Sequence, residues 1–196
     1  MSHSLGKLIC LAGIDGAGKS SFLQAYRKNG CKKAIPVDFY QELRFANQID
    51  SGGILADDIK NCLWLCEFMH SFGTKVRPKL MSGHSVITDR SPLCAQVYSE
   101  QTICSDITSL FYVYEELVKP DLLIYLDVSP VEAVRRIGLR KEKVASYETI
   151  NGLTRIREGY IKRLKQYSGQ FRVVDAMLPQ ELVAETINGI INSVLQ

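Results

Sequence analysis

The chain is expected to fold as an α/β protein, a three-layer αβα sandwich around a five-stranded parallel sheet. Two observations predict this class. Short runs are apolar throughout, as in strands covered on both faces, and they alternate along the chain with longer stretches of helical spacing. This order requires right-handed crossovers, which place helices on both faces of a parallel sheet. Such a sheet binds ligands beyond the carboxyl ends of its strands, so functional residues are expected there.

Five apolar runs are predicted to be the strands. They cover residues 7–12, 34–37, 85–88, 122–126 and, with the weakest pattern, 171–174. Apolar residues at helical spacing fill the stretches between the runs. The predicted helices cover residues 20–29, 57–82, 105–118, 130–140, 153–168 and 179–195. Glycine, proline and polar residues separate these elements without forming a linker, and no repeat divides the chain, so residues 1–196 are expected to be one domain.

Composition and charge place the chain among ordinary globular proteins. Of its 196 residues, 46% are apolar and 23% are charged, and 24 basic against 21 acidic residues give a net charge of +3. This excess is too small for a dedicated nucleic-acid binder, so no nucleic-acid partner is expected. No apolar run approaches the roughly 20 residues that span a bilayer, so no membrane partner is expected. Six scattered cysteines and the lack of a secretory signal predict a reducing, cytoplasmic compartment.

The strongest local signal runs from Gly13 to Ser20, which fits the pattern G-x-x-x-x-G-K-[ST]. It stands between the first predicted strand and the first predicted helix, as this phosphate-binding loop, the P-loop, requires. Glycines let backbone N–H groups surround a phosphate, Lys19 reaches the β- and γ-phosphate oxygens of a nucleoside triphosphate, and Ser20 is a ligand for Mg²⁺. The residues predicted here to bind ATP are Gly13, Ile14, Asp15, Gly16, Ala17, Gly18, Lys19, Ser20 and Ser21.

An acidic and a basic residue follow another buried strand. Asp89 and Arg90 come directly after residues 85–88, so they are expected beside the P-loop, at the same edge of the sheet. Mg²⁺ and a second phosphate group would lie there, which makes Asp89 the predicted metal ligand next to Ser20. Asp127 also ends a predicted strand and is the alternative acid for the metal; it ranks below Asp89 because no arginine adjoins it, and it is interpreted as the cap of the next helix.

With these residues in place, the chain resembles the thymidylate kinase family over most of its length. The matching pieces occur in family order, at residues 13–20, 76–80, 83, 86–90, 98, 119–130, 136, 140 and 174–176. The resemblance implies a P-loop kinase fold with a small helical lid, here about residues 135–150, and a homodimer. It also implies transfer of the γ-phosphate of ATP to dTMP, giving dTDP, with Mg²⁺ as cofactor. The lid would supply Arg136 to ATP and Arg140 as the catalytic arginine.

The resemblance further implies how a deoxynucleoside monophosphate is bound. Asp15 would meet the 3′-hydroxyl of the acceptor sugar, and Arg90 would bind the acceptor phosphate. Trp64 takes the position of a phenylalanine that stacks on the base, and Tyr98 would exclude a 2′-hydroxyl. The catalytic candidates are Lys19, Asp89, Arg90 and Arg140, and the acceptor-binding candidates are Asp15, Asp38, Phe39, Trp64, Phe68, Arg90 and Tyr98.

Several positions depart from the family pattern. Val37 is followed by residues 38–40, Asp-Phe-Tyr, where many members have Arg-Glu-Pro-Gly-Gly. Phe68 replaces the arginine that reads the thymine edge, and Ser91 stands where the family has tyrosine. Residues 144–148 do not match the Asp-Arg-x-Glu sequence of the lid. The departures therefore fall on base readout and on the lid.

Three interpretations are open from the residues. In the first, the acceptor is a monophosphate, which needs no general base because its phosphate is already ionised near neutral pH. In the second, residues 89–91 belong to a deoxynucleoside kinase, and Asp38 is the carboxylate base that deprotonates a nucleoside 5′-hydroxyl. In the third, the altered base site and lid belong to a nucleotide-binding paralogue without activity. Phe39, Trp64 and Phe68 describe either an aromatic-rich pocket or simple core packing.

Overall fold

The computed structural model describes residues 5–29, 33–39, 57–100, 113–114, 116–140 and 144–196. Five strands form one parallel sheet in the order β2-β3-β1-β4-β5. They are β1 (Leu8–Ala12), β2 (Ile35–Val37), β3 (Val86–Thr88), β4 (Leu122–Asp127) and β5 (Phe171–Asp175). The predicted sheet is confirmed, and the bounds of each strand lie within one residue of those predicted.

The central strands explain why the apolar runs are continuous. β1 is buried along its whole length and β4 along all but its last residue, because both have helices above and below. β5, at the edge, is mostly exposed, which is why its pattern is the weakest. In the register of the sheet, Val37 of β2 pairs with Thr88 of β3. The residues that directly follow, Asp38 and Asp89, are therefore brought to one edge together with the P-loop that follows β1.

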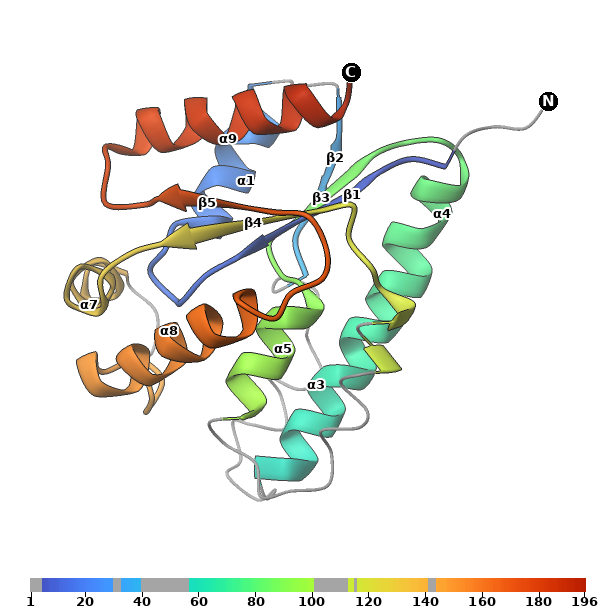
Figure 1. Cartoon of the computed structure of the whole chain (residues 1–196). Helices are drawn as coiled ribbons and strands as arrows, with labels where there is room; N and C mark the ends of the chain where they lie inside the picture. Colours follow the sequence, from blue (N-terminus) through green and yellow to red (C-terminus); the bar gives the residue numbers. More distant parts are fainter. Residues whose placement is uncertain (1–4, 30–32, 40–56, 101–112, 115, 141–143) are drawn as a thin grey trace.

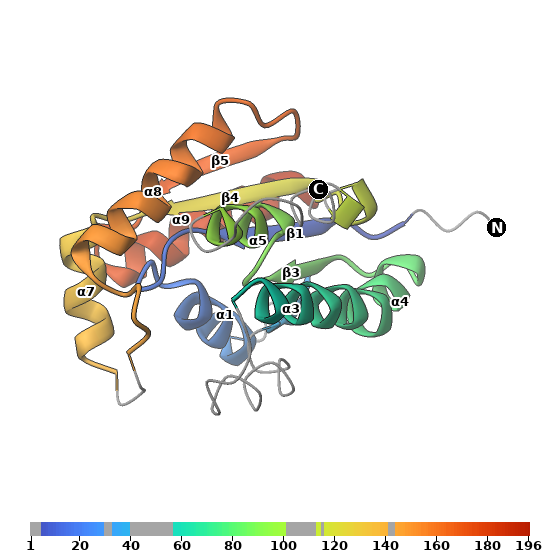
Figure 2. The same cartoon turned by 90° about the horizontal axis from the view of Figure 1, so that it is seen from below.

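Helices cover both faces of the sheet. They are α1 (Lys19–Lys28), α3 (Asp57–Ser71), η2 (Phe72–Val76), α4 (Arg77–Met81), α5 (Pro92–Ser99), α7 (Pro130–Gly138), α8 (Ile150–Leu164) and α9 (Gln180–Val194). α1 and α9 lie on one face, and α3, α5 and α8 lie on the other (Figure 1). Figure 2 shows these last three helices in front of the strands. α7 stands beyond the carboxyl end of β4. The three-layer sandwich expected from the sequence is confirmed.

The long helix predicted over residues 57–82 is interrupted. One wide π-helical stretch, η2, separates α3 from α4. Pro78 lies in the first turn of α4, and its missing N–H cannot continue the hydrogen-bond ladder of a single helix. The predicted helix over residues 105–118 lies mostly outside the described residues. In the part of the chain that is described, no helix is both long and apolar enough to cross a membrane.

Two helix starts differ from the sequence expectation, and a cap explains each. Residues 92–99, for which no element is predicted, form α5, whose first turn is capped by the hydroxyl oxygen of Ser91 accepting a hydrogen bond from the N–H of Cys94. α8 begins three residues early because Thr149 Oγ1 accepts from the N–H of Gly152, 3.1 Å away. The described part of the lid segment therefore contains the end of α7, a turn and the capped start of α8.

Candidate active site

The P-loop joins β1 to α1 through three glycines with positive φ. Gly13 has a φ of 143° and Gly16 a φ of 83°, conformations that side chains other than glycine rarely adopt. A Cβ on Gly16 would lie 2.6 Å from the carbonyl oxygen of Ala133 in α7, and one on Gly13 would lie 2.6 Å from that of Leu126. The loop is thus pressed against β4 and α7, and glycine is required for this close approach as well as for its backbone angles.

The side chain of Lys19 folds back onto the P-loop and bonds to its backbone. This side chain is buried, and Nζ donates hydrogen bonds to the carbonyl oxygens of Gly13 at 2.7 Å and Ile14 at 2.9 Å. Burial, with the nearby Arg90 guanidinium adding to it, lowers the pKa of Lys19 to about 8. An ammonium group held at the mouth of a glycine-rich loop at a helix start is what a phosphate requires.

The lowered pKa of Lys19 makes ATP binding pH-dependent. Above about pH 8 the free protein begins to lose this charge. A bound phosphate favours the charged form and raises the pKa, so binding takes up a proton. We expect the affinity for a non-hydrolysable ATP analogue, measured by calorimetry, to fall by up to about tenfold per pH unit above this value. Lys19→Arg, which stays charged, should show no such slope, and a flat wild-type profile would contradict the assignment.

Asp89 stands beside the start of α1. It is almost fully buried, its Oδ1 accepts the N–H of Phe39 at 2.9 Å, and its Oδ2 accepts the hydroxyl of Ser20 at 3.4 Å. The pKa of Asp89 is raised to about 6, mainly by burial and also by the hydrogen-bonded carboxyl group of Asp38, against the opposing effect of Arg90. Two carboxyl groups and a hydroxyl are ligands that suit Mg²⁺. These residues therefore fit the predicted metal site.

Asp15 is held from two sides. Its Oδ1 lies 3.3 Å from a guanidinium nitrogen of Arg90, and its Oδ2 accepts a 3.1 Å hydrogen bond from the hydroxyl of Tyr147. Burial alone would raise the pKa of Asp15, but Arg90, followed by Lys19 and Tyr147, outweighs it and holds the pKa below its usual value. The Arg90 guanidinium lies 5.8 Å from the centre of the Tyr98 ring. The structure thus brings a fixed anion of the P-loop, Asp15, together with a fixed cation, Arg90.

Tyr147 was not among the residues predicted from the sequence. Its position depends on Gly152, where a Cβ would lie 2.1 Å from the carbonyl oxygen of Tyr147, so only glycine allows the loop to approach α8 this closely. The ring of Tyr147 also meets that of Tyr98 edge-on, with 5.8 Å between centroids. Gly152 and Tyr98 are both far from the P-loop in the sequence. No sequence motif around Tyr147 indicates that it reaches the site.

Four rings pack together on the α3 side. We call Phe39, Trp64, Phe68 and Tyr114 the aromatic cluster. Phe68 lies edge-on to Phe39 at 5.9 Å, is stacked on Tyr114 at 6.4 Å and lies 6.0 Å from Trp64. Trp64 is half-buried, whereas the other three side chains are buried. Three members of the cluster are thus core residues, and Trp64 is the member with surface left for a ligand.

The two arginines of the predicted lid differ. Arg136 bonds to the carbonyl oxygens of Ala176 at 2.9 Å and Gly16 at 3.5 Å, and it is paired with Glu132, so it ties α7 to the P-loop. Arg140 is exposed in the turn after α7. Among the described residues, no hydrogen bond or ion pair joins its side chain to the P-loop. The structure brings Arg136 to the site and leaves Arg140 outside it.

The interpretation of Asp127 as a helix cap is wrong. Ser129 caps α7, its hydroxyl oxygen accepting from the N–H of Glu132. Asp127 instead forms a bidentate ion pair with Arg157 of α8, at 2.7 and 2.8 Å, and also accepts the hydroxyl of Tyr125 at 3.3 Å. The arginine adjoins it in space, 30 residues further along the chain. This pair fastens α8 to β4.

Breaking this ion pair should lower stability moderately. Both side chains are about one-third exposed, which weakens the pair, but the bidentate geometry strengthens it. We expect Arg157→Gln to cost about 1 kcal/mol and to lower Tm by about 2–4 °C, measured by thermal unfolding. Arg135→Gln, which breaks the more exposed pair with Glu132, is the matched control and should leave Tm unchanged. An equal decrease in Tm for Arg157→Gln and Arg135→Gln would contradict the larger contribution assigned to the pair of Arg157 with Asp127.

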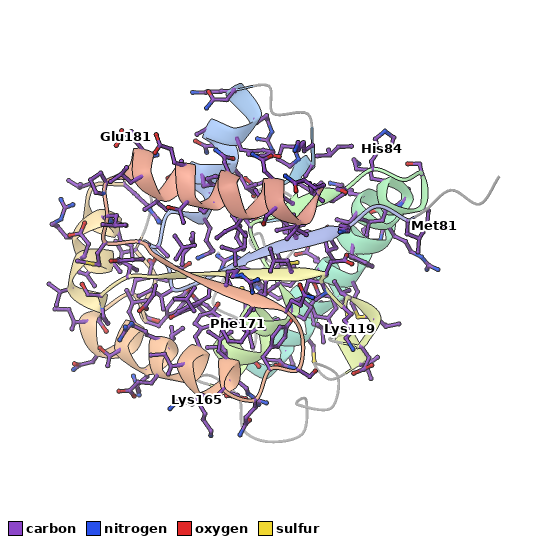
Figure 3. The ribbon with its side chains drawn as sticks, turned by 45° about the horizontal axis from the view of Figure 1, so that its top comes forward. Met81, His84, Lys119, Lys165, Phe171 and Glu181 are labelled. Carbon is purple, nitrogen blue, oxygen red and sulfur yellow. The ribbon has the colours of Figure 1, made fainter. Side chains whose placement is uncertain are left out.

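A cavity of about 330 Å³ lies away from these residues. Leu93, Lys119 and Arg163 are among the side chains that line it, and none of the predicted site residues does. Lys119 lies three residues before the start of β4, and in Figure 3 it is on the same side of the molecule as Met81 and His84, the side from which the strands start. The phosphate loop is at the opposite end of the sheet, so the two features are separate.

Phosphoryl transfer between nucleotides requires positive charge at both substrates. Here Lys19 is placed to contact a triphosphate, and Arg90 is placed to contact a second anion. The fold and this site together define the chain as an ATP-dependent nucleotide kinase of the P-loop class. A family model described as "Thymidylate kinase" matches residues 11–187. The chain belongs to the thymidylate kinase family.

Curated relatives align with this chain over nearly the full length of both sequences. The chain is 25% identical over 206 residues to the thymidylate kinase of Bacillus velezensis and 27% identical over 206 residues to that of Bacillus licheniformis, covering 97% of each chain in both cases. It is 28% identical over 199 residues to a probable thymidylate kinase of Methanosarcina mazei, covering 93% of each chain. At this identity the chain is a divergent member of its family.

Proposed function

We propose that the protein transfers the γ-phosphate of ATP to dTMP, giving dTDP. The observation that carries this proposal is the ion pair of Arg90 with Asp15 at 3.3 Å, beside the buried Lys19. Arg90 provides a fork of donors for an acceptor phosphate, and Asp15 provides an acceptor for a sugar hydroxyl. The names of the relatives support thymidylate as the acceptor.

Donor binding is assigned to the P-loop. Backbone N–H groups of residues 13–21 would surround the β-phosphate, Lys19 would contact the β- and γ-phosphate oxygens, and Arg136 would hold the loop. Ser20 and Asp89 would hold Mg²⁺, which neutralises charge on the phosphates when bound. Arg140 would reach the transferring group by movement of the lid segment, since it is exposed in this structure.

The reaction then depends on position and charge. The acceptor phosphate is already ionised near neutral pH, its second pKa being about 6, so its oxygen attacks without a base. Lys19 and Arg90 would draw the two anions together and offset the charge that spreads over the transferring oxygens. Asp15, ionised through its contacts with Arg90 and Tyr147, would fix the sugar.

A deoxynucleoside kinase is the second candidate, and the position of Asp38 favours it. Asp38 is buried at the same sheet edge and is hydrogen-bonded to Asp89, within the site where a base for a 5′-hydroxyl would act. The deciding experiment measures ADP release from ATP and Mg²⁺ with dTMP and thymidine side by side. Turnover of dTMP alone supports the proposal. Turnover of thymidine, abolished by Asp38→Asn, would replace it with the second candidate.

Assembly and location belong to the same proposal. We place a homodimer of one-domain chains in the cytoplasm, with small nucleotides as partners and neither nucleic acid nor membrane. The cysteines that the structure describes are free thiols, which supports a reducing compartment; they are Cys10, Cys62, Cys66 and Cys94. Light scattering after size-exclusion chromatography tests the dimer, and a monomer at working concentration would contradict it.

A further inference from the structure

The cavity of about 330 Å³ lies between α5, the end of α8 and the residues just before β4, and we call it the α5–α8 cavity. α5 and α8 are neighbours on one face of the sheet (Figures 1 and 2). Leu93 and Gln96 of α5 and Pro120 are buried, so they form its floor. Lys119 and Gln166 are exposed and belong to its rim. A volume of this size falls within the range of about 300–1,000 Å³ that small-molecule sites occupy.

Two cationic side chains from separate segments line the α5–α8 cavity, Arg163 of α8 and Lys119 before β4. The side chain of Arg163 is only 21% exposed, and one of its terminal nitrogens is paired with Glu100. A guanidinium group has five N–H donors, and within the described part of the chain this group has no other hydrogen-bond partner. Lys119 forms no hydrogen bond or ion pair with any residue that the structure describes. The cavity therefore offers fixed positive charge and donors that the described residues leave for a ligand.

This pair of cations matches a phosphate ester better than a carboxylate. A phosphate monoester carries a charge of about −1.5 to −2 at pH 7 and three strong acceptor oxygens, whereas a carboxylate carries one charge. The forked guanidinium of Arg163 and the point charge of Lys119 both suit phosphate oxygens. Glu116 also lines the cavity, and its carboxylate only accepts hydrogen bonds, so it suits hydroxyl groups on the same ligand. The ring of Tyr167 and the side chain of Leu93 add apolar surface for the body of that ligand.

We propose that the α5–α8 cavity binds a small phosphate ester with a hydroxyl-bearing body, a nucleotide or a sugar phosphate, whose phosphate lies between Lys119 and Arg163. The bound ester would join α8 to the segment that leads into β4. None of the residues lining the cavity belongs to the P-loop or to the proposed acceptor site. Because the P-loop is at the opposite end of the sheet, one chain can hold an ester here while nucleotides occupy the kinase site. The proposal therefore goes beyond the proposed function and does not depend on it.

Equilibrium dialysis of the whole protein counts the sites, with dTMP and 2-deoxyribose 5-phosphate as probes near neutral pH. In Lys119→Gln we expect Kd at the cavity to rise at least about tenfold, the loss expected for a charge-assisted hydrogen bond. Lys119 is exposed, so this replacement should leave the fold intact, and thermal unfolding checks it. Arg163→Gln should weaken the same site. The matched control is Lys165→Gln, because Lys165 is an exposed lysine just after α8 that does not line the cavity, and it should bind as the wild-type protein does (Figure 3).

The two probes and the kinase site are separated by their dependence on different residues. Binding of 2-deoxyribose 5-phosphate at a site that depends on Lys119 supports the proposal with a sugar phosphate as the ligand, and such binding by dTMP alone supports it with a nucleotide. Arg90→Ala, which disables the proposed acceptor site, should keep the cavity site. Failure of the proposed kinase function would thus leave this site in place. Binding of neither probe at a site that depends on Lys119, or equal losses in Lys119→Gln and Lys165→Gln, would overturn the proposal.

Discussion

Lys19→Ala should abolish phosphoryl transfer. The ammonium group is buried and already bonded to the carbonyl oxygens of Gly13 and Ile14, so it is fixed where the β- and γ-phosphate oxygens would lie. A fixed charge in a site shielded from water stabilises developing charge far more than one in water. We expect kcat/KM to fall by at least about 10³-fold, equivalent to about 4 kcal/mol, in the coupled ADP-release assay.

The control for this variant keeps the volume of the side chain. Lys19→Met fills the same space without the charge, so a comparable loss of activity assigns the effect to the ammonium group and not to a cavity. Far-UV circular dichroism should show that both variants fold. Turnover at the wild-type rate by either variant would exclude Lys19 from the proposed donor site.

The strands and the P-loop could be predicted because their signals are local. A strand buried on both faces is apolar along its whole length, and the lysine and glycines of a phosphate loop stand at fixed spacing. α5, for which no element is predicted, nevertheless carries a local signal of its own. Serine is a preferred N-cap residue and proline is favoured at the first position of a helix, and Ser91 and Pro92 occupy these two positions of α5.

The contacts that could not be predicted join residues far apart in the chain. Asp127 meets Arg157 across 30 residues, and Tyr147 meets Asp15 across 132 residues. The burial of Phe68 likewise depends on rings from two other segments. A sequence pattern indicates which face of a helix is apolar, but the partner of a polar side chain is set by how the helices pack on the sheet.

Arg90→Ala should disable the acceptor side of the site and leave the donor side working. We expect a higher KM for dTMP, a lower kcat and a loss in kcat/KM of about 10³-fold, because a charge-assisted, forked donor is removed from the proposed acceptor phosphate. ATP affinity, measured by calorimetry near neutral pH, should change little. Arg90→Lys keeps a positive charge but not the forked pair of donors, so its kcat/KM for dTMP should lie between those of the wild-type protein and Arg90→Ala. Loss of ATP affinity with an unchanged KM for dTMP would contradict the assignment.

The same variant should also change how ATP binding depends on pH. Arg90 lies close enough to Lys19 to contribute to its lowered pKa, and it is paired with Asp15, whose carboxylate acts in the opposite direction. Without Arg90, the repulsion is lost while the attraction by Asp15 remains, so the pKa of Lys19 should rise. ATP affinity in Arg90→Ala should therefore begin to decline at a higher pH than in the wild-type protein. Because a merely structural defect would weaken binding equally at every pH, this upward displacement separates an electrostatic link between the two sides of the site from general damage.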